Sequence, residues 1–205
     1  MSNLSRRFLM AAAAAAALAL SACSGQSAAG AADGDMTLGD PNAPIKMTEY
    51  ASLSCVHCAT FNNEVFPEFK AKYIDTGKVH YTFKEFLTPP AEVAAAGFLL
   101  ARCAGEDKYF DVVDAIFHSQ QEMFTTGDVR GTLLRVARSA GMTEQQFQAC
   151  ISDEAALRAL NARIEKSQRE ANIKATPTFA INGKVVKEGD MTMAELDAAI
   201  AAASK

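Results

Sequence analysis

Apolar and polar positions along the first part of the chain predict a strand, a helix and a second strand. Residues 45–50 are expected to form a short buried strand, and residues 79–86 alternate between apolar and polar side chains. Residues 55–76 follow a helical spacing, with Ser54 as the expected N-cap. Pro67 should kink this helix or split it in two, because proline cannot donate a helical hydrogen bond.

After two consecutive prolines at positions 89 and 90, the pattern is helical for about 80 residues. Thr143 and Gln146 have the spacing of a capping box, which marks the start of one helix. The predicted helices in this block cover residues 91–104, 109–121, 128–140, 143–150 and 155–171.

The C-terminal part predicts a hairpin followed by a helix. Asn182-Gly183 is the dipeptide best suited to a two-residue hairpin turn, and it separates the strand-like residues 178–181 from 185–187. Residues 193–200 then carry apolar side chains at helical spacing.

The order of these elements predicts an α/β fold with a mixed sheet. A hairpin that follows a strand–helix–strand start makes the helical block, at about residues 90–171, an inserted lobe. The chain has 205 residues, a net charge of −4 and 49% apolar residues. Residues 37–205 suffice for one domain with a sizeable core, and a mildly acidic chain without a basic run argues against a nucleic-acid partner.

Residues 1–23 have the positively charged start and apolar centre of an export signal. The apolar stretch is shorter than the ~20 residues that a membrane-spanning helix needs. Its end, Leu20-Ser21-Ala22-Cys23, resembles a bacterial lipobox. That resemblance implies lipidation of Cys23 and anchoring of the protein to a membrane.

One alternative to the lipobox stays open, an ordinary signal peptide cut near Cys23. The export route is open as well, because Arg6-Arg7 suggest the twin-arginine route without its usual spacer. Residues 24–36 are rich in Ser, Gly and Ala and are expected to form a flexible tether. Either export route predicts a periplasmic domain, in a compartment where disulfides persist.

The motif Cys55-Val56-His57-Cys58 carries the candidate chemistry. A cysteine at the start of a helix meets unpaired backbone N–H groups and the positive end of the helix dipole, which favour a thiolate. A second cysteine one turn later can resolve a mixed disulfide. The motif therefore predicts thiol–disulfide exchange; an inert structural bridge or half of a zinc site are the alternatives.

Counting cysteines leaves the second pair open. Four cysteines remain beside Cys23, and they allow three pairings. If Cys55 pairs with Cys58, then Cys103 and Cys150 either pair or both stay free. A bridge between them would stabilise the fold by about 4 kcal/mol in the chain-entropy model.

The Cys55–Cys58 motif, the later Thr176-Pro177 dipeptide and the helical block between them resemble the DsbA-like thiol:disulfide oxidoreductases of the thioredoxin superfamily. The resemblance covers residues 37–205. It implies a thioredoxin-like fold with an inserted helical domain, and it implies no cofactor.

The same resemblance assigns roles to the cysteines. Cys55 is implied to be the nucleophile, and Cys58 the resolving thiol of a redox-active disulfide. Members most like this chain carry a second cysteine pair in the helical lobe, so a structural disulfide between Cys103 and Cys150 is expected.

The resemblance also implies that Pro177 follows a cis peptide bond, which would place the backbone of Thr176 opposite Cys55. The imidazole of His57 is expected to donate to the Cys55 thiolate or to stabilise its charge. An ordinary trans proline and an exposed, unspecialised histidine are the alternatives.

Glu49 matches the buried acid that family members hold near the resolving cysteine. A buried carboxyl with a raised pKa can relay the proton of Cys58 during exchange. Lys84 could pair with Glu49 across the sheet, and a glutamate facing water is the alternative. His80 and His118 are expected to be structural or surface residues.

Together these features predict a periplasmic, monomeric oxidase that exchanges dithiols with exported proteins containing cysteine pairs, and that a membrane redox partner reoxidises. A reductase or isomerase of the same fold is the first alternative, since Thr176 before the proline is a residue that isomerases of the family often carry. The second alternative is a thioredoxin-like module that binds a metal through Cys55, His57 and Cys58.

Overall fold

The computed structural model describes residues 34–205. Its centre is a five-stranded sheet with the strand order β1-β3-β2-β4-β5. Only β2 and β3 are parallel neighbours; the other pairs within this sheet are antiparallel. The predicted mixed sheet is therefore confirmed. The strands are β1 (Met36–Leu38), β2 (Ile45–Ala51), β3 (Val79–Glu85), β4 (Thr178–Ile181) and β5 (Lys184–Glu188).

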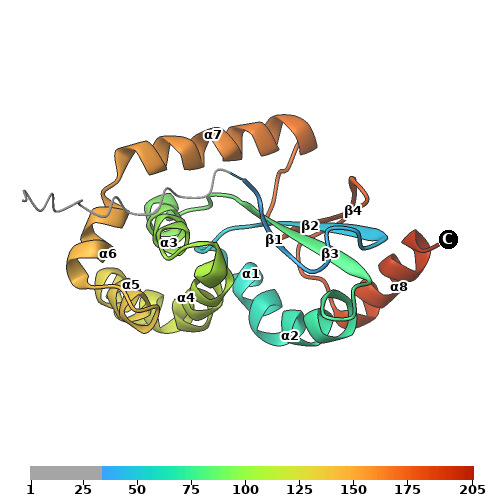
Figure 1. The fold of residues 1–205 in the computed structure, drawn as a ribbon, viewed down its shortest axis with the longest axis horizontal. Coiled ribbons are helices and arrows are strands. Elements are labelled where there is room, and N and C mark those ends of the chain that lie inside the picture. Colours follow the sequence, from blue (N-terminus) through green and yellow to red (C-terminus); the bar gives the residue numbers. More distant parts are fainter. Residues whose placement is uncertain (1–33) are drawn as a thin grey trace, which may run out of the picture.

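Helices cover both faces of the sheet (Figure 1). The helix α7 (Glu154–Ala171) lies along one face, and α1 (Val56–Thr60), α2 (Phe66–Phe69) and α8 (Met193–Ala203) lie against the other. Contacts between α7 and β3 and between α8 and β4 agree with this arrangement. The sheet is thus the middle layer of the domain.

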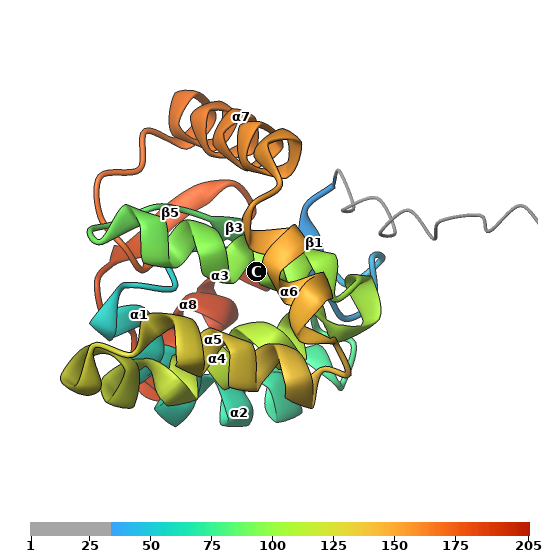
Figure 2. The same cartoon turned by 90° about the vertical axis from the view of Figure 1, so that its left-hand side faces the viewer.

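The remaining helices form a lobe at one end of the sheet, as the quarter-turn view shows (Figure 2). The lobe is inserted between β3 and β4, as predicted. Its helices are α3 (Ala91–Cys103), α4 (Glu106–Thr126), α5 (Val129–Ser139) and α6 (Glu144–Ile151). The helix α4 is longer than the predicted 109–121, because it begins after Gly105 and its buried stripe continues to Met123 before Gly127 ends it in a left-handed conformation.

The predicted helix over residues 55–76 is divided differently from the expected proline kink. Two π turns, at Phe61–Val65 and Lys70–Ile74, flank α2. In the first, the N–H of Phe66 donates to the carbonyl of Phe61, five residues earlier. This wider turn places Pro67 in the first turn of α2, where a missing N–H costs no hydrogen bond.

The predicted N-cap of this helix was wrong by one residue. Cys55 occupies the N-cap position, and no side chain caps it. The hydroxyl of Ser54 instead donates to the carbonyl of Thr88 at 2.7 Å, and it lies 3.0 Å from the Thr88 hydroxyl. Ser54 therefore ties the loop before α1 to the loop after β3.

The hairpin turn has the predicted geometry. Asn182 and Gly183 both have positive φ, at 49° and 77°, as a type I′ turn requires. The side-chain oxygen of Asn182 accepts a hydrogen bond from the N–H of Lys46 at 3.0 Å. The turn is therefore also tied to the start of β2.

A disulfide joins Cys103 at the end of α3 to Cys150 in α6, with their Cα atoms 6.0 Å apart. It crosslinks two helices that pack against each other inside the lobe. The second cysteine pair, which counting alone left open, is thus bonded.

A buried ionic cluster fastens the lobe to the sheet. Glu85, at the end of β3, accepts from Nε of Arg102 in α3 at 2.5 Å and from Nε of Arg163 in α7 at 3.0 Å. The Tyr109 hydroxyl of α4 also donates to it, at 3.2 Å. One carboxylate thus binds three helices, and breaking a buried pair of this kind costs about 3–5 kcal/mol.

The strand β1 begins at Met36, which was predicted to be the last residue of the flexible tether. Met36 is buried and starts β1, which pairs with β3. Asp35 accepts a hydrogen bond from Lys84 at 2.6 Å. Lys84 therefore pairs with Asp35 rather than with Glu49, and that prediction was wrong. The predicted export signal, with Cys23, lies outside the described residues.

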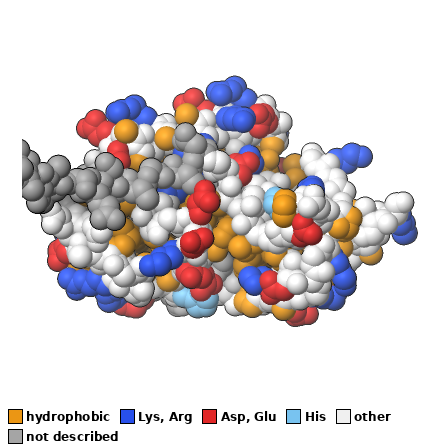
Figure 3. Space-filling view, in the orientation of Figure 1, with side chains coloured by type: hydrophobic (Ala, Val, Ile, Leu, Met, Phe, Trp, Pro, Cys, Tyr) orange, Lys and Arg blue, Asp and Glu red, His pale blue; other side chains and the backbone are white. Residues whose placement is uncertain are grey.

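Charged side chains of both signs are interspersed over the face drawn in Figure 3. Exposed ion pairs such as Lys70–Asp75 and Lys72–Asp197 have N–O distances of 2.7 and 2.8 Å. Exposed pairs contribute only about 0–1 kcal/mol each, so the fold depends mainly on its apolar core. Within residues 34–205, no helix combines the length and the apolar character needed to cross a bilayer.

Candidate active site

Cys55 and Cys58 lie where β2 ends and α1 begins, and both are free thiols in this structure. Cys55 is half-buried, whereas Cys58, one turn into the helix, is fully buried. Only the first sulfur is thus open to a second molecule.

The surroundings of Cys55 lower its thiol pKa from 9.0 to about 5. The largest cause is a hydrogen bond from the Cys58 thiol, which outweighs the opposing effect of burial. The Thr176 side chain and the backbone N–H groups of Cys58 and His57 add further hydrogen bonds that favour the thiolate. At neutral pH Cys55 is therefore mostly ionised and nucleophilic.

Cys58 has the opposite character. Burial raises its pKa well above 9.0, and the neighbouring Cys55 and Glu49 add to this effect because a second negative charge beside them is unfavourable. Cys58 therefore remains a thiol at neutral pH, and a base must remove its proton before it can attack.

Glu49, on β2, is the candidate base, and only 2% of it is exposed. Burial raises its pKa from 4.5 to about 8, against the lowering effect of a hydrogen bond from the Tyr81 hydroxyl. That hydroxyl lies 2.5 Å from Oε2 of Glu49. The negative charge of the Cys55 thiolate raises the pKa of Glu49 further.

Tyr81 lies within the predicted strand 79–86, but it was not predicted as a site residue. It pairs with Met47 in the parallel register of β2 and β3, and Met47 lies two residues before Glu49. Side chains two residues apart share one face of a strand, so the register brings Tyr81 to Glu49. The contact between Tyr81 and Glu49 could not be predicted from the sequence, because it depends on that register.

The Thr176–Pro177 peptide bond is cis. The Sγ of Cys55 lies 3.3 Å from the carbonyl oxygen of Thr176, to which the thiol can donate. Residues 121 positions apart in the sequence thus meet at the nucleophile. The backbone of Thr176 therefore faces Cys55.

The imidazole of His57 does not bind Cys55 as expected. Its Nδ1 lies 2.9 Å from Oδ2 of Asp190, in the loop between β5 and α8. The contribution of His57 to the Cys55 thiolate comes from its backbone N–H. Asp190, 133 positions away in the sequence, was not predicted as a site residue.

Gln120 of α4 holds the loop before the motif from the lobe side. Its amide Nε2 donates to the carbonyls of Leu53 at 2.9 Å and of Cys55 at 3.2 Å, and the residue is 2% exposed. This role could not be predicted from the sequence, because a glutamine at a helical position usually faces water. The buried amide fixes the approach of the chain to Cys55.

Nearby, His118 is exposed, as expected, and its Nδ1 lies 3.0 Å from the carbonyl oxygen of Asp114. His80 is on β3 and is partly buried. These positions indicate no role for His118 or His80 in thiol–disulfide exchange.

The fold and the cysteine pair define a thioredoxin-like protein with an inserted helical lobe. The family model described as "Thioredoxin" matches residues 31–202, so the chain belongs to the thioredoxin family. Its similarity to DsbA proteins is seen in the crystal structure of α-DsbA1 from Wolbachia pipientis. That protein is 31% identical, and the match covers 82% of this chain and 89% of that chain, with a TM-score of 0.73.

Relatives with curated names are also similar to this chain in sequence. A Rickettsia bellii protein named "Putative protein-disulfide oxidoreductase" is 32% identical over 152 residues, which are 74% of this chain and 58% of the relative. "Disulfide bond formation protein D" of Bacillus subtilis is 26% identical over 164 residues, 75% of this chain and 70% of that protein. The chain thus spans less than two thirds of the length of the Rickettsia relative.

Proposed function

We propose that this protein is a periplasmic thiol:disulfide oxidoreductase that oxidises cysteine pairs in exported proteins through Cys55 and Cys58. The observation that carries the proposal is the contrast between the two thiols. One is half-exposed with a pKa of about 5, and the other is buried with a pKa well above 9. A stabilised thiolate favours the reduced enzyme, which makes its disulfide a strong oxidant.

In the first step, a client thiolate attacks Sγ of Cys55 in the oxidised enzyme. The Cys55–Cys58 bond breaks, a mixed disulfide forms between the client and Cys55, and Cys58 leaves with the electron pair. Protonated Glu49 can give its proton to Cys58, because burial holds the pKa of this carboxyl near 8.

In the second step, the second client thiolate attacks the client sulfur of the mixed disulfide. Cys55 leaves as a thiolate, which its low pKa favours, and the client departs with a new disulfide. The enzyme has gained two electrons. A membrane redox partner carrying a disulfide would take them, with Glu49 accepting the Cys58 proton on the way back.

The remaining site residues position the client. We assign to the backbone of Thr176, before Pro177, the pairing with an extended client segment beside Cys55. To His57 we assign a backbone N–H that stabilises the thiolate, with its side chain held by Asp190. Cys103 and Cys150 act as a structural disulfide away from the exchange.

We further propose that the domain works as a monomer anchored to a membrane by lipid at Cys23. The lipobox-like run in the sequence supports this part of the proposal. Anchoring would hold the domain near a membrane partner, which raises the local concentration of one for the other.

The reduction potential of the Cys55–Cys58 pair, equilibrated against glutathione, tests the direction of the reaction. A value near or above about −150 mV is expected for an oxidase, and a value below about −230 mV would instead support a reductase or isomerase. The same measurement on a variant with both Cys103 and Cys150 replaced by Ala, in which only the Cys55–Cys58 pair can form a disulfide, shows that the measured potential belongs to that pair. If Cys55→Ser retains substantial exchange activity, the proposal is wrong; metal affinity that is lost on oxidation, with no exchange, would indicate a metal-binding module.

A further inference from the structure

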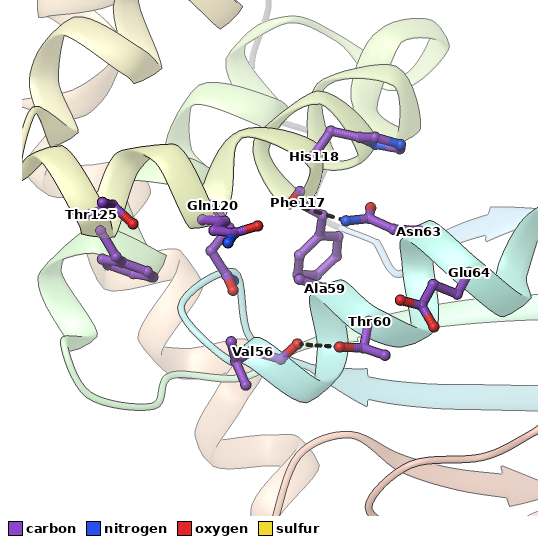
Figure 4. A pocket seen from close by; sticks show the side chains of 11 residues that line it. Val56, Ala59, Thr60, Asn63, Glu64, Phe117, His118, Gln120 and Thr125 are labelled. Atoms are coloured by element: carbon purple, nitrogen blue, oxygen red, sulfur yellow. Dashed lines mark hydrogen bonds between the residues drawn. The ribbon is translucent and has the colours of Figure 1, made fainter.

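The helical segment that begins at Cys55 is held by contacts with two other parts of the fold. On the lobe side, Nδ2 of Asn63 donates to the carbonyl of Phe117 in α4 at 3.4 Å, which Figure 4 shows as a dashed line. Elsewhere on the segment, the imidazole of His57 contacts Asp190 in the loop between β5 and α8. The proposed exchange uses the backbone N–H of His57 but gives its imidazole no step.

The backbone around Asp190 is fixed by its two neighbours. The N–H of Gly189 donates to the carbonyl of Pro177 at 2.8 Å, so the residue before Asp190 is bonded to the cis-proline segment. Met191, the residue after it, is only 3% exposed. The Asp190 carboxylate is therefore carried by a fixed piece of chain, which is bonded to the same segment that faces Cys55.

Both carboxylate oxygens of Asp190 lie close to Nδ1 of His57, at 2.9 and 3.1 Å. An ionised carboxylate only accepts hydrogen bonds, so Nδ1 carries the proton in this pair. The two side chains are 61% and 55% exposed, and exposed pairs of this kind add little to the stability of a fold. The consequence of the pair is therefore to be sought at Cys55, two residues before His57.

The pair with Asp190 decides where the Nδ1 proton of His57 is donated. The backbone N–H of His57 already favours the Cys55 thiolate, so this residue lies beside the sulfur. Rotation of its side chain about the Cα–Cβ bond changes the distance from Nδ1 to that sulfur. A donor that reaches a thiolate stabilises it, but a single N–H is donated fully to only one acceptor at a time. While Asp190 accepts the Nδ1 proton, the Cys55 sulfur does not receive it.

We propose that Asp190 is a positioning residue that holds the His57 imidazole away from the Cys55 sulfur, and so limits how strongly oxidising the Cys55–Cys58 disulfide is. This inference rests on the proposed function and concerns the regulation of its redox pair. Without Asp190, the Nδ1–H is free to approach the sulfur, and an additional hydrogen bond to the thiolate favours the reduced enzyme. The equilibrium should change roughly three- to tenfold, which corresponds to about one hydrogen bond.

The test is the equilibrium of the full chain with glutathione, in which reduction of the Cys55–Cys58 disulfide oxidises two glutathione thiols to one glutathione disulfide. Asp190→Ala should shift this equilibrium towards the reduced protein by roughly three- to tenfold, which is about 15–30 mV in reduction potential. Asp190→Asn keeps an oxygen that can accept from Nδ1, so it should shift the equilibrium less.

Asp75→Ala is the matched control, because Asp75 also forms an exposed pair, with Lys70 at 2.7 Å. Asp75 precedes β3, whereas the cysteine motif follows β2, and these two strands are parallel. The control therefore removes a carboxylate at the opposite end of the strand pair from Cys55. Its equilibrium with glutathione should equal that of the wild type.

A His57→Ala background distinguishes positioning of the imidazole from a direct effect of the Asp190 charge. In that background Asp190→Ala should no longer change the equilibrium, because no imidazole remains to be held. An equal shift in both backgrounds would assign the effect to the charge and overturn the proposal. An unchanged or lower potential in Asp190→Ala alone would also overturn it. The proposed function is tested separately by the wild-type potential: a value in the range of a reductase would contradict the oxidase, while the differences between variants would still test Asp190.

Discussion

The hydroxyl of Tyr81 donates a hydrogen bond to Oε2 of Glu49 over 2.5 Å, and both residues are only 2% exposed. Tyr81 lies on β3 and Glu49 on β2, so the contact crosses the parallel pair at the centre of the sheet. This single donor opposes the desolvation that raises the pKa of Glu49 to about 8. Without it, the carboxyl would release its proton only at higher pH.

Replacing Tyr81 by Phe should therefore raise the pKa of Glu49. The ring and its packing stay, and only the donor to the ionised carboxylate is lost. Hydrogen bonds to charged groups are worth about 1.5–3 kcal/mol, so we expect an upward shift of roughly one pH unit or more. The titration of the Glu49 carboxyl, followed by NMR in the reduced protein, measures it.

Tyr73→Phe is the control for this variant, because Tyr73 also donates to a carboxylate, that of Asp197, at 2.7 Å. It should leave the Glu49 titration unchanged. A Tyr81→Phe protein that loses stability but titrates as wild type would show that the hydroxyl has only a structural role.

Replacing Glu49 by Gln should change how stability depends on pH. Glu49 titrates at 4.5 in the unfolded chain and at about 8 in the folded protein. Between these values the unfolded chain binds fewer protons, so the free energy of unfolding falls as pH rises, and above 8 the penalty is constant. Cys55, lowered from 9.0 to about 5, acts in the opposite sense, so its contribution rises between pH 5 and 9.

In the reduced wild-type protein these two trends oppose each other between pH 5 and 8. In reduced Glu49→Gln the falling Glu49 trend is removed and the Cys55 trend remains, so the variant should gain stability over wild type across that window. The gain should be on the order of 4 kcal/mol. Denaturant unfolding at a series of pH values checks it, and parallel curves for the two proteins would contradict the buried titration of Glu49.

Much of the fold could be predicted because it depends on local patterns. The alternation along β3, the Asn182-Gly183 turn and the Thr143–Gln146 capping box each need only a few neighbouring residues, and the structure contains all three. Three-residue β1 carries too short a pattern to be recognised. This strand forms because it pairs with the edge of β3.

Other polar contacts of the site could not be predicted, because the fold alone brings their partners together. His57 meets Asp190 across more than a hundred residues, whereas the contact of Cys55 with Thr176 was expected from the family resemblance. The sequence indicated Glu49 by its place before the motif, but the choice of Tyr81 over Lys84 follows from strand register. Lys84 points to Asp35 at the edge of the sheet instead.

Removing the second disulfide should destabilise the fold without changing the exchange site. The bridge joins Cys103 and Cys150, 47 positions apart, and a loop of this size is worth about 4 kcal/mol in the chain-entropy model. Cys103→Ala combined with Cys150→Ala should lower the free energy of unfolding by roughly 2–4 kcal/mol. The thiolate absorbance of Cys55 should still titrate at a pKa of about 5; a large shift would show that the lobe disulfide tunes the nucleophile.

The pH dependence of the reduction potential should reveal the protons of the site. Reducing the disulfide takes two electrons, and below pH 5 it also takes two protons. Above that pH Cys55 stays ionised with a pKa of about 5, so one proton suffices. The potential should therefore fall by ~59 mV per pH unit below pH 5 and by ~30 mV above it.

Glu49 should also affect how the reduction potential depends on pH. The Cys55 thiolate raises the pKa of Glu49, so reduction also draws part of a proton onto this carboxyl at pH values below about 8. The wild-type slope between pH 5 and 8 should thus be steeper than the ~30 mV per unit of Glu49→Gln, with both proteins keeping the break near pH 5. Equal slopes in wild type and Glu49→Gln would show that Glu49 takes up no proton when the Cys55–Cys58 disulfide is reduced. A single slope of ~59 mV through neutral pH would mean that Cys55 remains protonated, and the contrast between the two thiols would no longer support an oxidase.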